Sequence, residues 1–199
     1  MTADSSQATP AAIQRLQEEH NNISKLLNIL ERHLALFKAD QSPDYELIKE
    51  VADYFMSYPD TCHHPKEDLI YEKLKLRDPR AAEAGNLPEQ HAKLAGRTRQ
   101  FSALVDALLR EAQVSRSDFE MAARDFLEYQ RTHMLMEEKH FLPAAKRALT
   151  DEDWADIEAR MSQPDDPLFS DAVESRFESL RRQIIDWDAE DMARSQANQ

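Results

Sequence analysis

The first part of the chain repeats hydrophobic residues at intervals of three and four positions, the spacing of the buried face of a helix in a bundle. The pattern runs from Ala11 to Ala39. Its apolar members are Ile13, Leu16, Ile23, Leu27, Leu30, Leu34 and Phe37. One place on this face, between Leu16 and Ile23, is taken by His20 instead of a hydrophobic residue. The pattern therefore predicts a long amphipathic helix with one histidine on its inner face.

A second helix is predicted to begin after Pro43. Its inner face consists of Leu47, Val51, Tyr54, Phe55 and Tyr58. Pro59 and Pro65 follow within a stretch that continues towards Leu74. Because proline lacks a backbone donor and clashes with the preceding turn, we expect these two residues to kink or break the helix. A loop is predicted at 78–86.

Two further helices are predicted between this loop and Thr150. The third has Pro88 in its first turn, where proline is favoured. Its inner face consists of Leu87, His91, Leu94, Thr98, Phe101, Val105 and Leu108. The fourth follows the candidate N-caps Ser115 and Ser117, and Pro143 and Thr150 mark its end. Its inner face consists of Phe119, Ala122, Phe126, Tyr129, His133, Glu137, His140 and Ala144.

The residues after the fourth helix form a separate unit. Thr150 begins a capped short helix that runs through Met161. A last amphipathic helix has an apolar stripe of Val173, Phe177, Leu180 and Ile184, with Trp187 as a further candidate. The predicted fold class is thus an all-α four-helix bundle over 11–148 with a C-terminal helical extension and frayed tail over 149–199. The stripe is expected to pack on the bundle, with a homodimer contact as the alternative.

The amino-acid composition agrees with a helical protein, and the net charge and cysteine content exclude several classes of partner and site. The 199 residues include only two glycines, which argues against a sheet protein. The net charge of −13 disfavours binding to nucleic acid or to an anionic membrane surface. A single cysteine, Cys62, excludes an intramolecular disulfide and fits a reducing compartment. Since no apolar stretch is long enough to span a bilayer, we expect a cytoplasmic protein.

The strongest chemical signal is a histidine followed four positions later by a glutamate, which occurs twice. The two pairs are His63 with Glu67 and His133 with Glu137. On a helix this spacing puts both side chains on one face, so they can bind one metal ion and reach a second. His20 and His91 add one imidazole each from the other two helices. Burying such groups without partners costs several kcal/mol each, and this ligand set favours iron, with manganese and zinc as competitors.

The order of these motifs resembles the hemerythrin-like cation-binding (HHE) family. The resemblance covers roughly residues 11–148 and rests on the segments 16–20 (LQEEH), 63–68 (HHPKED), 89–91 (EQH) and 133–138 (HMLMEE). It implies an up-down-up-down bundle that holds two iron ions, bridged by an oxo or hydroxo group and by two carboxylates. Glu67 and Glu137 are the bridging ligands that it implies. The terminal ligands that it implies are His20, His63, His91 and His133.

The third helix departs from the oxygen-carrying members of the family. Those carriers have a second histidine one turn after the first, and this sequence has Ala95 there. With four imidazoles instead of five, both iron ions keep an exchangeable position, which disfavours simple oxygen carriage. The sequence predicts a di-iron protein that binds or reacts with oxygen, nitric oxide or peroxide. A di-iron redox enzyme, or a protein that repairs iron centres or donates iron under oxidative or nitrosative stress, is the alternative.

Several neighbouring residues have a simpler interpretation than metal binding. His140 shares a helical face with Glu137 and is a candidate fifth imidazole, but an outer or surface position is favoured. His64 is expected to point about 100° away from His63, as an outer polar group. Core packing is favoured over a chemical role for Tyr54, Tyr58, Tyr129, Cys62, Met134 and Met136. A solvated position is favoured over orienting a ligand for Glu18, Glu19, Asp68 and Glu138.

Overall fold

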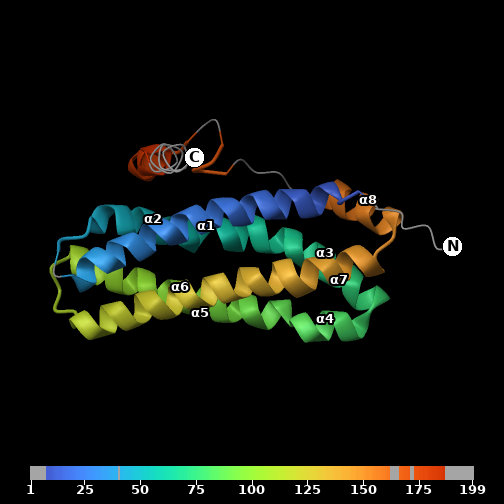
Figure 1. The fold of residues 1–199 in the computed structure, drawn as a ribbon, viewed down its shortest axis with the longest axis horizontal. Coiled ribbons are helices and arrows are strands. Elements are labelled where there is room, and N and C mark those ends of the chain that lie inside the picture. Colours follow the sequence, from blue (N-terminus) through green and yellow to red (C-terminus); the bar gives the residue numbers. More distant parts are fainter. Residues whose placement is uncertain (1–7, 40, 162–165, 171–172, 187–199) are drawn as a thin grey trace, which may run out of the picture.

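The computed structural model describes residues 8–39, 41–161, 166–170 and 173–186, and these residues form helices and no strands. Four long helical segments lie side by side as a bundle (Figure 1). They are α1 (Ala11–Lys38); α2 (Tyr45–Tyr58) with η1 (Pro59–His63) and α3 (His64–Arg77); α5 (Leu87–Leu109); and α6 (Arg116–Met136) with η2 (Glu137–Phe141) and α7 (Leu142–Ala148). Every helix in the described part of the chain is too short or too polar to cross a bilayer.

The second and fourth segments each contain one π-helical turn, η1 and η2. The backbone N–H of His64 donates to the carbonyl of Pro59, five residues earlier, and that of Leu142 donates to the carbonyl of Glu137. The helix therefore continues through Pro59 and Pro65, and the predicted break does not occur. A wider turn accommodates Pro59, while Pro65 lies in the first turn of α3, where its missing donor is tolerated.

The prediction of a loop at 78–86 was wrong, because most of it forms α4 (Pro79–Gly85). The Asp78 side chain accepts a hydrogen bond from the backbone N–H of Ala81 at 3.1 Å and so caps this helix. Pro79 follows in the first turn, where proline is favoured. Asn86 ends α4 in the left-handed conformation, with φ of 38°, and α5 begins at the next residue.

The helix starts predicted from capping residues were largely confirmed. Ser115, and not Ser117, caps α6 by accepting from the backbone N–H of Asp118 at 3.0 Å. Thr150 caps α8 (Asp151–Arg160) through a reciprocal capping box with Asp153. The helix of the fourth segment continues past Pro143 to Ala148, because Pro143 lies in the first turn of α7.

The buried apolar residues of the bundle form two clusters. The first apolar cluster is centred on aromatic residues such as Phe101, Phe119 and Phe126. The second apolar cluster lies towards α7 and α8 and includes Leu16 and Trp154. On each long segment the chain passes from one cluster to the other through a buried polar position. On α1, for example, His20 lies between Leu16 of the second cluster and Ile23 of the first.

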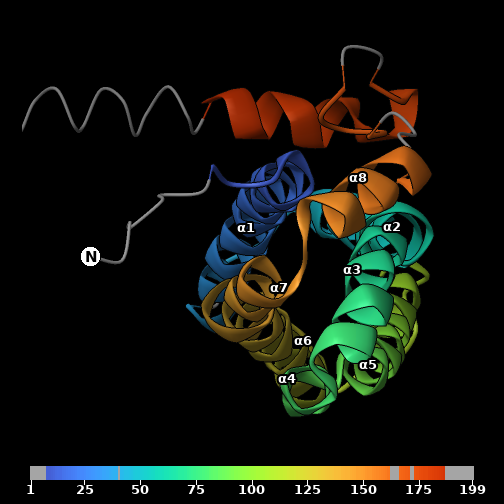
Figure 2. The same ribbon diagram turned by 90° about the vertical axis from the view of Figure 1, so that its right-hand side faces the viewer.

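The C-terminal extension packs on the bundle. Its last described residues form η3 (Ser175–Phe177) and a helix at 178–186, which lies across the outside of α1 and α2 (Figure 2). Leu168, Phe177, Leu180 and Ile184 are buried members of the first apolar cluster. The Tyr54 hydroxyl also donates to Asp166 at 2.9 Å. Phe177, Leu180 and Ile184 of the predicted stripe are therefore buried within the chain and Val173 is partly buried. Trp187 and the tail lie outside the described residues.

Candidate metal centre

The six predicted ligands meet in the polar layer between the two apolar clusters. Each long segment contributes one histidine, and two segments also contribute a glutamate. They are His20 from α1, His63 from η1, Glu67 from α3, His91 from α5, His133 from α6 and Glu137 from η2. Both carboxylates are completely buried, three of the imidazoles are buried, and His91 is partly buried. The helices therefore assemble at one level of the bundle the residues that the sequence pattern singled out.

Glu67 lies between two groups of imidazoles. Its Oε1 atom is 3.4 Å from His63 Nε2 and 3.6 Å from His20 Nε2. Its Oε2 atom is 3.2 Å from His91 Nε2. One oxygen thus faces the first imidazole group, His20 and His63, and the other faces the second imidazole group, to which His91 belongs.

Glu137 divides its oxygens in the same way. Its Oε2 atom is 3.3 Å from His20 Nε2 in the first imidazole group. Its Oε1 atom is 2.9 Å from His133 Nε2 and 3.9 Å from His91 Nε2, which form the second imidazole group. Two carboxylates that each turn one oxygen to each of two imidazole groups are placed as a carboxylate-bridged metal pair would require.

The donor atoms at this centre lack hydrogen bonds within the described residues. Both oxygens of Glu67 and of Glu137, and the Nε2 atoms of His20, His91 and His133, are buried without a hydrogen-bond partner. Leaving buried polar atoms unsatisfied costs about 1–3 kcal/mol each, and more when the group is charged. Metal ions between the two imidazole groups would accept lone pairs from all of these atoms, so the residues present fit a bound pair.

The outer nitrogens of the first imidazole group are held by carboxylates. His20 Nδ1 donates to Glu138 at 2.8 Å, and His63 Nδ1 donates to Glu19 at 2.7 Å. Glu19 also accepts from the buried ammonium of Lys66. A hydrogen bond at Nδ1 fixes the ring and directs the Nε2 lone pair to the centre. Glu19 and Glu138 therefore orient the imidazoles of His63 and His20, although a solvated position was the favoured prediction.

The outer nitrogens of the second imidazole group contact Asp68, for which a solvated position was favoured, and Gln90, which was not predicted. His91 Nδ1 lies 3.5 Å from Asp68 Oδ1, and His133 Nδ1 donates to the Gln90 side-chain oxygen at 3.0 Å. The amide nitrogen of Gln90 donates to the backbone carbonyl of Gly85, which fixes the direction of its oxygen. Sequence reasoning missed Gln90 and Lys66, and the only signal for Gln90 was its place beside His91. Glu18, by contrast, is exposed, as favoured.

The electrostatics of the metal-free centre demand positive charge. Burial alone would lower the pKa of His20, but the neighbouring carboxylates, Glu137 foremost, raise it to about 12. Burial is likewise outweighed at His91, where Asp68 and the central carboxylates raise the pKa to about 11. Burial raises the pKa of the two glutamates, and the surrounding imidazoles lower it. The resulting pKa is about 2 for Glu137 and well below the usual range for Glu67. Protonated imidazoles thus supply the positive charge that the buried carboxylates require, as metal ions would.

Other candidate residues divide between the centre and its surroundings. His140 is exposed and lies outside the metal-binding groups found among the described residues, as favoured. His64 is buried and, contrary to the prediction, belongs to such a group together with Glu67, His91 and His133. The three tyrosines make other contacts: Tyr54 with Asp166, Tyr58 with the Lys66 ammonium and Tyr129 with the Arg97 guanidinium. Cys62 is half-buried against the first apolar cluster.

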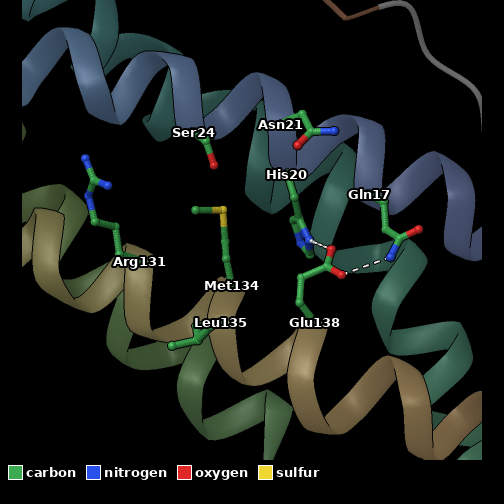
Figure 3. A pocket seen from close by; sticks show the side chains of 8 residues that line it. All are labelled: Gln17, His20, Asn21, Ser24, Arg131, Met134, Leu135 and Glu138. Carbon is green, nitrogen blue, oxygen red and sulfur yellow. Dashed lines mark hydrogen bonds and ion pairs between the residues drawn. The ribbon is translucent and has the colours of Figure 1, made fainter.

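An open groove of about 560 Å³ runs between α1 and α6 and reaches the His20 side of the centre. Figure 3 shows Glu138 between His20 and Gln17, from both of which it accepts a hydrogen bond. Met134 and Leu135 of α6 supply apolar surface in the same groove. A small molecule in this groove would therefore lie next to the first imidazole group.

The fold and the donor set together define a helical cation-binding domain. The profile of the hemerythrin HHE cation binding domain matches residues 11–145, which include all six predicted ligands and both π-helical turns. The chain belongs to this family. Searches of curated proteins and of solved structures returned no match.

Proposed function

We propose that the protein holds a non-haem di-iron centre, oxo- or hydroxo-bridged, that binds or reacts with a small ligand such as oxygen, nitric oxide or peroxide. The proposed ligands are His20, His63, Glu67, His91, His133 and Glu137. The observation that carries the proposal is the division of both buried carboxylates between the two imidazole groups. A site for one ion would need only one such group.

The topology we propose is the up-down-up-down four-helix bundle over 11–148, with 149–199 as an extension. Support comes from the short connections between successive long segments and from the packing of α2 on α5, α5 on α6, and α1 on both α6 and α2. In such a bundle all four long segments pass the same level once, so each can contribute a histidine to one layer.

The residues around the centre have separable tasks in this proposal. When bound, a di-iron pair supplies one-electron redox chemistry and exchangeable positions for a small ligand. The imidazoles and carboxylates hold the pair, and Glu19, Glu138 and Gln90 orient imidazoles through Nδ1. The two apolar clusters keep bulk water away from either end of the layer. The groove beside His20 gives a small ligand a route to the centre.

The second candidate function is a redox enzyme, or a protein that repairs iron centres or donates iron, in oxidative or nitrosative stress. Ala95 favours it, because α5 supplies no second imidazole one turn after His91. Exchangeable positions on both ions suit turnover or metal release better than storage of one ligand.

The test is the metal content of protein produced in iron-replete cells, with absorption spectra before and after anaerobic reduction and re-exposure to oxygen. We expect two iron ions per chain and near-ultraviolet bands of a bridged ferric pair. A persistent oxygen adduct would favour ligand binding, and immediate oxidation would favour the second candidate. Fewer than one iron per chain, or zinc alone, would refute the di-iron centre.

A further inference from the structure

His64 lies at the centre, although its position next to His63 suggested that it would point elsewhere. Its side chain is buried, and its ring stacks on the ring of His91 with centroids 4.0 Å apart and an interplanar angle of 14°. It meets the His133 ring edge-on at 6.1 Å. One nitrogen of His64 and ligand atoms of Glu67, His91 and His133 all lie within 4.8 Å of one another. His64 thus adds a third imidazole to the second group.

The outer nitrogen of His64 carries the same kind of contact as those of the proposed ligands. His64 Nδ1 donates to Asp60 Oδ1 at 3.1 Å, so Nε2 is the ring nitrogen that carries the lone pair for a metal ion. The two other remaining histidines differ. His33 Nδ1 accepts a hydrogen bond from the backbone N–H of Asp44, and His140 is exposed. The pattern of an anchored Nδ1 and a buried ring near the carboxylates therefore selects His64 alone among the three.

The π-helical turn η1 explains how two consecutive histidines reach the same layer. His63 is the last residue of η1, and the backbone N–H of His64 closes the turn on Pro59. A π-helical turn contains more residues than an α-helical turn, so consecutive side chains diverge by a smaller angle. His63 can then face the first imidazole group while His64 faces the second. The prolines that were expected to kink or break the helix accompany this wide turn.

We propose that His64 is a fifth imidazole ligand, bound to the same metal ion as His91 and His133. This inference rests on the proposed metal pair and specifies it further. The second imidazole group then has three members and the first has two, with Glu67 and Glu137 between them. The imidazole that Ala95 cannot supply from α5 comes instead from α3. The two ions consequently differ in ligand number. The ion held by His20 and His63 has fewer imidazoles and lies nearer the groove, so with this fifth ligand the exchangeable position belongs to that ion.

The test uses Co²⁺ as the probe and His64→Phe as the variant, because phenylalanine keeps a flat ring to stack on His91 but has no nitrogen. In proton NMR spectra of Co²⁺-loaded protein, each ligand imidazole with an anchored Nδ1–H gives one strongly shifted, solvent-exchangeable signal. We expect five such signals for the natural protein and four at most for His64→Phe. We also expect the variant to bind its second Co²⁺ at least about 100-fold more weakly.

The controls separate loss of a ligand from loss of structure. His140→Phe changes an exposed histidine of the same chain, and it should keep five signals and both affinities. Circular dichroism checks that His64→Phe remains helical. In a second variant, His64→Ala, free imidazole can enter the vacated space, and we expect it to restore the second Co²⁺ site.

Two outcomes would overturn the inference. Four signals in the natural protein, together with natural affinity for both ions in His64→Phe, would show that His64 only stacks on His91; the proposed pair would survive. A natural protein that bound fewer than two ions would refute the pair itself and the fifth ligand with it. Weak second-site binding in both His64 variants, with rescue by imidazole in His64→Ala, would support the inference.

Discussion

Two regions of this bundle, the first apolar cluster and the histidine–carboxylate layer, both contain completely buried side chains but differ in the free energy of burying them. Phe126 and Glu67 are both completely buried. Phe126 stacks on Phe101 with centroids 5.0 Å apart and meets Phe55 edge-on at 5.1 Å. Burial of such rings is favourable in itself. Burial of the Glu67 carboxylate is unfavourable, since neither of its oxygens has a hydrogen bond within the described structure.

The difference indicates that the apolar cluster stabilises the fold and that the layer is suited to bind metal ions. The apolar clusters lie on both sides of the layer and supply stabilisation that does not depend on a metal. Part of that stabilisation is offset by the unfavourable burial of the two carboxylates in the layer. Such an arrangement is typical of functional sites, where local cost is tolerated because the surrounding structure fixes the geometry.

The largest expected effect is that of Glu67→Ala on metal binding. The substitution removes both oxygens that connect the two imidazole groups through α3, so we expect binding of the pair to be abolished. Metal analysis and the absorption spectrum of the reconstituted variant measure this directly, and circular dichroism checks that the helices remain. Glu83→Ala, which changes an exposed glutamate of α4, is the matched control and should bind two ions. Two ions with an unchanged spectrum in Glu67→Ala would disprove the assignment of the ligands.

The converse experiment is Phe126→Ala in the first apolar cluster. Removal of a completely buried aromatic ring costs about 3–5 kcal/mol of unfolding free energy. We expect this loss in urea denaturation of the metal-free protein, while the folded variant still binds two ions. If Phe126→Ala lost one ion as well, the apolar cluster and the layer would not be separable regions.

The helices and most of the site could be predicted because both depend on local spacing. The three-and-four repeat of α1 and the histidine–glutamate pairs need only the period of a helix. The position of His64 could not be predicted, because it depends on a π-helical turn and not on the α-helical period. Prolines indicate that a helix is perturbed, but they do not distinguish a break from a wide turn.

Two residues that support the imidazoles, Gln90 and Lys66, could not be predicted from the sequence. Gln90 contacts His133 across two different helices, and no spacing within one helix indicates such a pair. Lys66 is buried because its ammonium donates a hydrogen bond to Glu19 of α1. In a sequence, a lysine is by default expected on the protein surface. The loop predicted at 78–86 is a different case. Asp78 followed by Pro79 is a sequence signal for the start of a capped helix.

The last prediction concerns the number of protons that the histidine–carboxylate layer releases when it binds metal ions. The raised pKa values, about 12 for His20 and about 11 for His91, mean that both imidazoles are protonated in the metal-free protein at pH 8. A metal ion binds only the neutral ring, so loading the pair should release about two protons. Glutamates with lowered pKa values are already ionised at pH 8 and contribute none. Histidines with ordinary pKa values near 6.5 would release almost no protons at this pH.

Calorimetric titration with Co²⁺ in buffers of different ionisation enthalpy measures the number of protons released. The sign follows directly: two protons compete with the ions, so the overall affinity for the pair should fall about 100-fold for each unit by which the pH is lowered from 9 to 7. A proton release near zero at pH 8, with affinity independent of pH, would mean that the carboxylates of the empty layer are neutralised in some other way than by their imidazole neighbours.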